Sequence, residues 1–415
     1  MTVSRRRSAL LVVASLLAIT AATLVSLPDQ AEAVAQTSFW CVLCGSLGAV
    51  DVILNVALFF PLGAALRLHG FRLRSIIGLS LAVSLTLELL QGAIPGRDPT
   101  ISDVLTNTAG GLLGGWAVTW WPHFIHPRPR TAAALAAAWA ALWLAQTAAV
   151  AWLLQPALPR SWYWGQLAPD LPQFEQFYGT VRSASAGNLG IYIGRLARSP
   201  EVRQALLEGA PLRGTTTRGT RTPGLAPIVS IFDQEQREIA LIGRWGDDLV
   251  YRFRTRTFDV RLRPPAVRFT NALAGSAGEM VDVSGHYDPD SAAFVVGLRG
   301  DSSEPLQRRL ALDAQWGWSL LLPFPYAHGP EAPWWTGVWL LVWMVVLGYW
   351  SWSYQPAAGL AAGVVAALGL GPLPALLGLT PAPGYEWMVA AGGLTAGAAL
   401  AIRRGRGAPL LRRTA

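Results

Sequence analysis

Residues 101–121 read ISDVLTNTAGGLLGGWAVTWW, an apolar segment long enough to cross a bilayer that nevertheless carries Asp103 and Asn107. A charged side chain near the end of a membrane helix costs free energy, so such residues usually face protein or water and mark a function. We therefore ask whether other polar side chains lie at the same depth as Asp103.

The composition of the whole chain predicts a polytopic α-helical membrane protein. Of its 415 residues, 52% are hydrophobic and only 14% are charged, and its mean hydropathy is positive. A helix needs about 20 mainly apolar residues to cross about 30 Å of hydrocarbon. We predict eight transmembrane helices, at residues 8–27, 47–66, 75–95, 101–121, 132–154, 333–350, 356–379 and 384–402.

These helices divide the chain into five predicted parts. The first is a four-helix membrane domain, and the second contains a fifth helix with its connection. A soluble domain is then inserted before three C-terminal helices and a basic tail. The corresponding residues are 1–121, 122–154, 155–332, 333–402 and 403–415.

Arginines predict the topology, because short cytoplasmic loops of membrane proteins are enriched in basic residues. The sequence has no lysine, and segments free of acidic residues carry the arginines Arg5, Arg6, Arg7, Arg67, Arg72, Arg74, Arg128, Arg130, Arg403, Arg404, Arg406, Arg412 and Arg413. This pattern predicts a multi-pass cell-membrane protein with both termini in the cytoplasm and residues 155–332 outside. The net charge of +8 is thus mostly a consequence of topology, so we expect no nucleic-acid partner.

Two features of the N-terminal region allow alternative interpretations. The first span is preceded by three arginines and followed by Pro28 and Ala31-Glu32-Ala33, as in a cleavable signal peptide, but its apolar run is longer than a usual signal core. We favour an uncleaved helix. Cys41 and Cys44 form a single C-x-x-C pair, which we interpret as structural or incidental, since a redox or metal site needs further ligands.

Three predicted helices each carry one carboxylate and one carboxamide. Asp51 and Asn55 are four residues apart, Glu88 and Gln91 are three apart, and Asp103 and Asn107 are again four apart, so each pair shares one helix face. All three pairs fall near the predicted outer surface. We expect one outward-facing polar pocket, with Glu88, Asp103 and Arg97 as the candidate catalytic residues and with Asp51, Asn55, Gln91 and Asn107 lining it.

Arg97 and Asp98 lie in the short loop between the second and third pairs. Arg97 is the expected countercharge that allows the carboxylates to ionise. An alternative for Asp103 alone is a capping role behind an N-cap at Ser102, where the helix dipole favours an acidic residue. That alternative leaves Glu88, at the unfavourable C-terminal end of its helix, unexplained.

The order of these residues resembles a known family. The motifs are D-x3-N-x5-PLG from Asp51, E-x2-Q from Glu88 and R-D-x4-D-x3-N-x2-GG-x2-G from Arg97. Together they resemble the VanZ-like membrane domain over about residues 10–121. The resemblance implies four helices, a cell-envelope role linked to tolerance of teicoplanin-type glycopeptide antibiotics, and functional roles for the seven pocket residues. It implies no particular reaction.

Residues 155–332 have a different pattern, with short alternating runs separated by turn residues. The runs lie at 226–233, 238–245, 248–262, 292–300 and 316–324, and residues 201–208 are the one convincing short helix. Such period-two runs predict an antiparallel sandwich. The segment IVSIFDQEQREIALIGRWGDDLVYRFR resembles the concanavalin-A/laminin-G-like jelly roll, which implies carbohydrate binding.

Acidic and aromatic residues of this domain have two interpretations each. One interpretation of Asp233, Glu235 and Glu238 is a glycosidase site, which requires two carboxylates that flank the glycosidic bond. We favour the other, a solvated face. Asp288 and Asp290, with His286, are either a metal loop or an Asp-rich turn, and we favour the turn. Tryptophans either stack on sugars or fill the core, namely Trp162, Trp164, Trp245, Trp316 and Trp318.

Two functions remain open from the sequence. One is a non-catalytic envelope protein whose external domain binds glycan or another ligand. The other is an intramembrane enzyme or transfer protein that acts on a lipid-linked or cell-wall precursor, with Glu88 or Asp103 as general base and Arg97 holding an anionic headgroup. We expect membrane lipid as a partner and no cofactor or metal.

Overall fold

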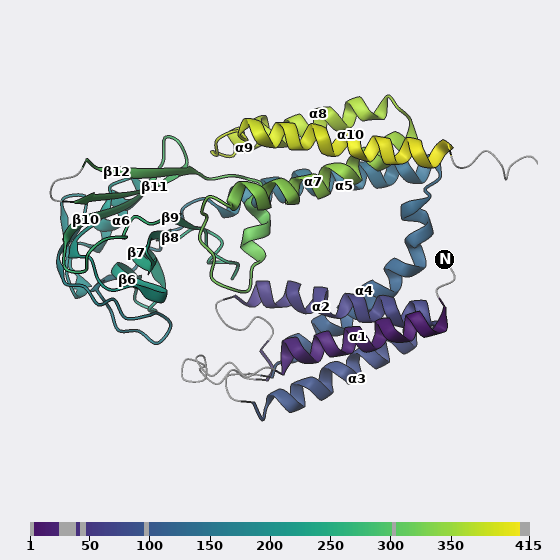
Figure 1. Ribbon diagram of the computed structural model, residues 1–415, viewed down its shortest axis with the longest axis horizontal. Helices are drawn as coiled ribbons and strands as arrows, with labels where there is room; N and C mark the ends of the chain where they lie inside the picture. Colours follow the sequence, from purple (N-terminus) through teal and green to yellow (C-terminus); the bar gives the residue numbers. More distant parts are fainter. Residues whose placement is uncertain (1–3, 25–38, 42–46, 95–98, 301–303, 407–415) are drawn as a thin grey trace, which may run out of the picture. The chain divides into compact units, whose positions relative to one another are not determined.

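The computed structural model describes residues 4–24, 39–41, 47–94, 99–300 and 304–406. The chain forms two compact units. Unit 1 is Met1–Arg128 with Val260–Arg263, and unit 2 is Pro129–Asp259 with Pro264–Ala415. Figure 1 shows helices throughout unit 1, whereas unit 2 combines a β domain with a second group of helices.

Unit 1 contains α1 (Arg5–Thr23), α2 (Gly48–His69), α3 (Leu73–Gln91) and α4 (Ile101–Ile125). Glycines on α4 allow its backbone to approach both neighbouring helices. A Cβ atom added at Gly110 would collide with the Val56 carbonyl of α2, and one added at Gly111 would collide with the Ser80 hydroxyl of α3. Small residues of this kind are the usual means of close helix packing in membranes.

α1 packs against α2 and α3 through apolar side chains. The buried cluster comprises Ile19, Phe59, Leu62, Leu66, Ile76 and Leu87. α2 runs unbroken through Pro61, although the proline supplies no backbone donor. The positions of α2, α3 and α4 are therefore fixed by apolar contacts along the bundle and by glycines at the close approaches.

The β domain of unit 2 consists of two six-stranded antiparallel sheets, as the alternating runs predicted. The first has the order β4-β1-β6-β7-β8-β9, with bounds Gly194–Leu196, Tyr163–Leu167, Thr222–Asp233, Glu238–Gly246, Asp248–Phe253 and Ala266–Phe269. The second has the order β12-β11-β10-β5-β2-β3, with bounds Leu306–Ala311, Ala293–Gly300, Met280–Asp288, Leu212–Thr217, Val181–Ala186 and Leu189–Ile191.

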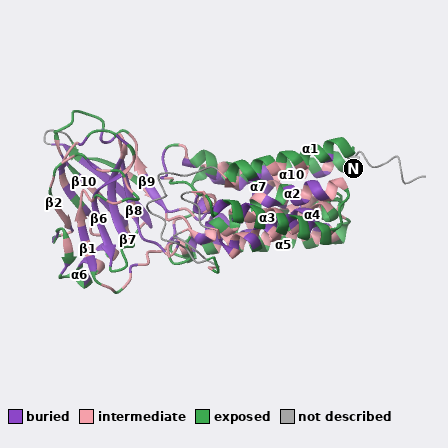
Figure 2. Cartoon of the chain, turned by 90° about the horizontal axis from the view of Figure 1, so that it is seen from below, coloured by how far each residue is buried: buried purple, intermediate pink, exposed green. Residues whose placement is uncertain are grey.

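Aromatic side chains from both sheets meet in the core of the sandwich. Tyr251 packs edge-on against Phe294 with ring centroids 5.7 Å apart, and Phe253 stacks on Tyr287 at 5.9 Å. Gly285 leaves space for the Tyr251 ring, because a Cβ atom at this position would collide with it. Figure 2 shows the buried residues concentrated along the strands and the exposed ones on the surrounding loops.

The structure confirms one local prediction for this domain and corrects two. The short helix is α6 (Ser199–Leu207). The run at 316–324 is not a strand, because it begins with the 3₁₀ helix η2 (Trp316–Leu321), whose turn is closed by the Ser319 hydroxyl donating to the Trp316 carbonyl at 2.9 Å. The run at 248–262 is a strand only as far as Phe253. Turns follow, in which the Phe258 amide donates to the Thr255 carbonyl and the Asp259 amide donates to the Arg256 carbonyl.

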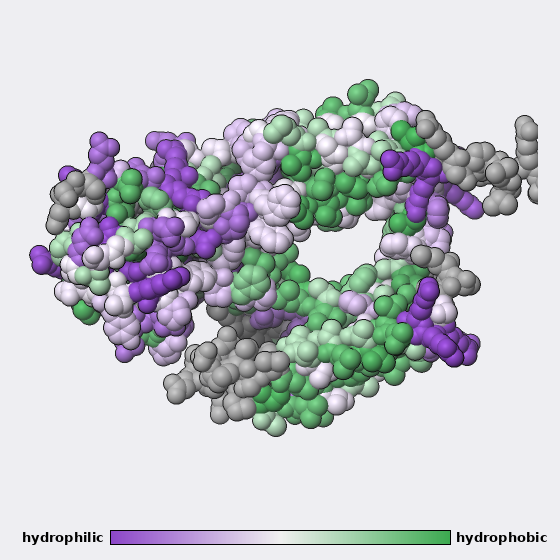
Figure 3. Space-filling model, in the orientation of Figure 1, coloured by the Kyte–Doolittle hydropathy of each residue, from purple (hydrophilic) through white to green (hydrophobic). Residues whose placement is uncertain are grey.

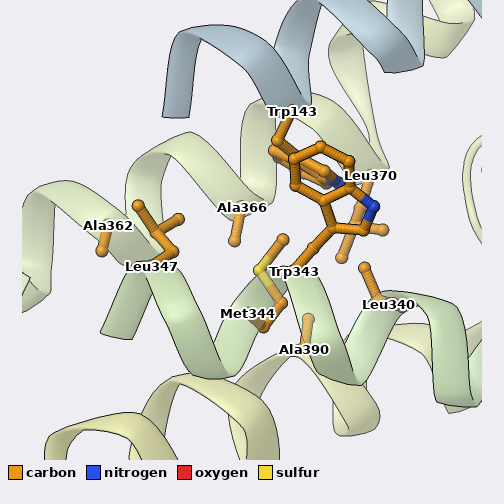
Figure 4. Packing of buried hydrophobic residues seen from close by; sticks show 9 residues of the cluster. All are labelled: Trp143, Leu340, Trp343, Met344, Leu347, Ala362, Ala366, Leu370 and Ala390. Carbon is orange, nitrogen blue, oxygen red and sulfur yellow. The ribbon is translucent and has the colours of Figure 1, made fainter. Parts of the chain in front are cut away.

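The remaining helices of unit 2 are α5 (Pro129–Leu153), α7 (Ala332–Tyr354), α8 (Ala358–Leu370), α9 (Pro372–Leu376) and α10 (Gly384–Arg406). Figure 4 shows how Trp143 of α5 lies beside Trp343 of α7 and Leu370 of α8. Gly369 leaves room for the Trp143 ring, since a Cβ atom there would collide with it. These helices therefore share one apolar core.

Six described helical segments are long and apolar enough to cross a membrane: α1, α2, α3, α5, α7 and Ala358–Leu376. α4 and α10, with 25 and 23 residues, have sufficient length but are not among these six. Their glycines, threonines and polar residues lower their hydropathy. Hydrophobic residues cover much of the helical surface in Figure 3, and hydrophilic ones gather on the β domain and near helix ends. The chain is a multi-pass membrane protein.

Candidate functional site

The carboxylate of Asp103 accepts a hydrogen bond from the side chain of Asn55. The Asn55 Nδ2 to Asp103 Oδ1 distance is 2.6 Å, and the bond joins α2 to α4. Both residues are partly buried near the N-terminal ends of their helices. The four-residue spacings on α2 and α4 therefore place one carboxamide and one carboxylate in direct contact between the two helices.

Two further carboxyl groups act on Asp103. Asp51 of α2 and Glu88 of α3 each interact electrostatically with its carboxylate. Asp51 is exposed, whereas only 4% of Glu88 is exposed. Three acidic side chains from three helices thus lie at the end of the bundle where α2 and α4 begin and α3 ends. This end is opposite to the one that carries Arg67, Arg72 and Arg74.

Thr100 connects Glu88 to the start of α4. Thr100, and not Ser102, is the N-cap of α4, and its hydroxyl accepts a hydrogen bond from the Asp103 amide at 3.2 Å. In a complete capping box the Asp103 carboxylate would accept from the Thr100 amide. Here the Thr100 amide donates to Glu88 Oε2 at 3.0 Å instead. The Asp103 carboxylate itself bonds to Asn55 and to the side chain of the N-cap residue Thr100.

A second polar layer lies deeper between α3 and α4. The Asn107 side chain donates to the Ser84 hydroxyl at 2.9 Å, and both residues are buried. The Asn107 carbonyl oxygen and the Ser80 hydroxyl are buried without a hydrogen-bond partner among the described residues. Because buried polar atoms are nearly always paired, unpaired ones require an explanation such as a ligand or a functional role.

Two of the seven predicted pocket residues are not described as part of the acidic site, namely Gln91, which has a different partner, and Arg97. Gln91 donates to the Thr23 carbonyl of α1 at 3.0 Å and so joins α3 to the end of α1. It follows Glu88 and is the last residue of α3. Arg97 lies outside the described residues, as does Asp98. Its role as countercharge remains a prediction.

The serines of α3 and the threonine before α4 were missed in the sequence. Ser80, Ser84 and Glu88 recur every four residues, which places them on one helix face, so periodicity alone was sufficient to find them. Thr100 was detectable as a T-x-x-D pattern at a helix start. The carboxylate of Asp103 and the carboxamide of Asn55 are rare groups in an apolar segment, whereas the hydroxyls of serine and threonine are common there.

Residues 6–122 match the family model described as VanZ/LLP1. Residues 6–122, which we term the VanZ region, are therefore similar to the VanZ/LLP1 family. The match covers the four helices of the VanZ region and therefore every residue of the acidic site. No curated protein and no solved structure matches the chain.

The acidic candidates in the β domain have structural partners. Asp233 is buried rather than solvated, and its Oδ2 pairs with Arg237 and Arg254 at 2.9 and 3.0 Å. Asp288 accepts from the Ser291 hydroxyl and pairs with Arg309 at 2.6 Å. No group of three His, Cys, Asp or Glu residues within the described ranges is placed to hold a metal ion.

The tryptophans of the β domain range from buried to exposed, and Trp164, Trp245 and Trp318 are intermediate. Trp316 is 3% exposed and stacks on His328, with ring centroids 3.8 Å apart, so it is part of the interior. Trp162 is 43% exposed, and the Arg195 guanidinium lies 4.3 Å above its ring. Trp162 is therefore the candidate for contact with a ligand, while Trp316 packs the fold.

Proposed function

We propose that the chain is a cell-envelope membrane protein that holds a polar part of an envelope molecule at the acidic site of its VanZ region. The observation that carries the proposal is that Asp51 of α2 and Glu88 of α3 both interact electrostatically with Asp103 of α4, whose carboxylate bonds to Asn55. Carboxylates within a membrane bundle are costly unless they bind cations, donors or water. A site that only joined helices would not need three of them.

The hydrogen bonds of the site support a binding role. Among the described residues, Glu88 accepts from the Thr100 amide, and Asp103 accepts from Asn55 and is hydrogen-bonded to the Thr100 side chain. A carboxylate can accept several bonds, so both retain acceptor capacity for a ligand. The acidic character favours a ligand group that is cationic or rich in donors, such as an ammonium or a set of hydroxyls. The family resemblance adds glycopeptide tolerance of the teicoplanin type as the expected phenotype.

The proposed topology has eight transmembrane helices, both termini in the cytoplasm and the β domain outside. The arginine pattern supports it, and so does the disulfide-bonded state of Cys41, since disulfides persist in oxidising compartments. Trp334 and Trp335 at the start of α7 are 71% and 50% exposed, as is usual for tryptophans at a membrane surface. In this topology the acidic site faces the envelope.

For the β domain we propose a lectin-like role with a concanavalin-A/laminin-G-like fold. Two antiparallel sheets and the exposed Trp162 support it, because aromatic rings exposed on such domains bind sugars by stacking. A cell-wall glycan or a lipid-linked precursor is the expected ligand. A catalytic variant of the proposal, with Glu88 or Asp103 as general base, applies to the same acidic site.

The test is to identify what copurifies with the intact protein from envelope membranes. Mass spectrometry of extracted wild-type protein should reveal a polar envelope molecule that is absent from Asp103→Asn protein. Asn at this position can still accept from Asn55, so only the charge is lost. Thr108→Val is the control, because the Thr108 hydroxyl donates to its own helix at Val104. Identical extracts from wild type and Asp103→Asn would contradict the proposal.

A further inference from the structure

An apolar groove lies at the other end of the VanZ region, away from the acidic site. It has a volume of about 350 Å³ and lies between α1, α2 and α3, with a lining that includes Val13, Leu16, Leu66, His69, Leu79 and Val83. These residues come from the first two thirds of α1, the last turns of α2 and the first two thirds of α3. The groove thus belongs to the end of the bundle that carries the arginines.

The groove is open on its side. Val13 is 53% exposed and Leu79 is 37% exposed, although both line it. All three helices are long and apolar enough to cross a membrane, so their exposed flanks face hydrocarbon. A groove of this size is within the range of about 300–1,000 Å³ that is usual for ligand sites, and its apolar walls suit a hydrocarbon chain.

The mouth of the groove is polar and basic. His69 lines it, and its Nδ1 lies 2.9 Å from the Ser8 hydroxyl of α1. Arg7 precedes Ser8 in the sequence, Arg72 and Arg74 follow the lining residue Phe71 by one and three residues, and all three arginines are exposed. The described residues of this helix end include no acidic side chain.

We propose that this groove binds one acyl chain of an anionic phospholipid, with its phosphate held by the arginines at the mouth. The apolar walls and membrane setting select a lipid chain, and the cationic rim selects a negatively charged headgroup. Arginines near a membrane surface each contribute about 1 kcal/mol to attraction of anionic lipid. The inference does not depend on the function proposed for the acidic site.

The experiment measures binding of added phosphatidylglycerol and phosphatidylcholine to the purified full-length protein by native mass spectrometry. Leu79→Trp fills the groove and should weaken phosphatidylglycerol binding about tenfold. Leu81→Trp is the matched control, because Leu81 is 43% exposed on the same helix and does not line the groove. It should bind like wild type. Arg72→Ala should weaken phosphatidylglycerol binding about fivefold and leave phosphatidylcholine unchanged.

Thermal unfolding of each variant separates loss of binding from loss of fold. If Leu79→Trp unfolds below the temperature of wild type, Val13→Trp fills the groove from α1 and replaces it. Equal binding of the two lipids to wild type, or equal phosphatidylglycerol binding by the groove and control variants, overturns the proposal. Loss of the polar envelope molecule from Asp103→Asn, with phosphatidylglycerol binding intact, would show that the two sites are independent.

Discussion

Replacing Glu88 separates its role as an acceptor from its role as a charge. Its Oε2 accepts from the Thr100 amide at 3.0 Å, and the residue is only 4% exposed. Glu88→Gln keeps an acceptor oxygen of nearly the same shape but removes the charge. Glu88→Leu keeps much of the volume but leaves the Thr100 amide buried without this acceptor.

The expected cost follows from the lost hydrogen bond. A buried donor without its partner costs about 1–3 kcal/mol, and hydrogen bonds between membrane helices average about 0.6 kcal/mol with a maximum of about 1.7. We therefore expect Glu88→Leu to lower the free energy of unfolding by about 1–2 kcal/mol. We expect Glu88→Gln to lower it by less than about 1 kcal/mol, since loss of repulsion from Asp103 offsets the weaker acceptor.

The assay is equilibrium unfolding in detergent, in which purified wild type and each variant are titrated with denaturant to obtain their free energies of unfolding. Thr100→Ser serves as control, because it retains both the amide and a capping hydroxyl. If Glu88→Leu is as stable as wild type, the bond to Thr100 does not hold the start of α4. If Glu88→Gln is as unstable as Glu88→Leu, the charge and not the acceptor stabilises the site.

Three other predictions concern packing, pH and topology. Gly110→Ala should destabilise unit 1 by about 1–3 kcal/mol, because the added methyl group clashes with α2. Gly78→Ala, where no atom lies within reach of the added Cβ, should instead stabilise the helix by up to about 1 kcal/mol. Equal stability of the two variants would refute the close packing. Burial lowers the pKa of His328 to about 4 from 6.5, so its neutral form stabilises the fold above pH 6.5 and that contribution is lost as the pH falls toward 4. When the pH is lowered from 7 to 4.5, the free energy of unfolding of a His328→Phe variant should therefore fall by about 2 kcal/mol less than that of wild type. The same fall in both proteins would contradict this prediction. A cysteine introduced at Asp247 should react with a label added outside intact cells, whereas one introduced at Arg406 should react only after permeabilisation. The reverse pattern would overturn the topology.

The contact between Asp103 and Asn55 was predictable because helical periodicity fixes which side chains share a face. Each polar pair shares one helix face, and all three pairs were predicted at the same depth of three helices. The partner of Gln91 was not predictable. It is a backbone carbonyl at the end of α1, and any residue at that position offers the same group.

The error at residues 316–324 has a local cause. WGWSLLLPF alternates in hydropathy and has bulky residues, which favour a strand. In the structure Trp316 stacks on His328, which is distant in sequence, and η2 packs beside α5 and α7 with Gly317 next to Gln146. Tertiary contacts therefore decide the conformation. The order of strands in the two sheets likewise depends on pairings that no short pattern encodes.

Teicoplanin susceptibility tests the requirement for the acidic site most directly. Cells that lack the protein would express wild type, Asp103→Asn or Thr108→Val at equal abundance in the membrane, and the minimum inhibitory concentration would be measured for each. We predict that wild type and Thr108→Val restore tolerance and that Asp103→Asn does not, although its thermal stability matches wild type. Full tolerance with Asp103→Asn would contradict the claim that the charge of this site serves a function in the envelope.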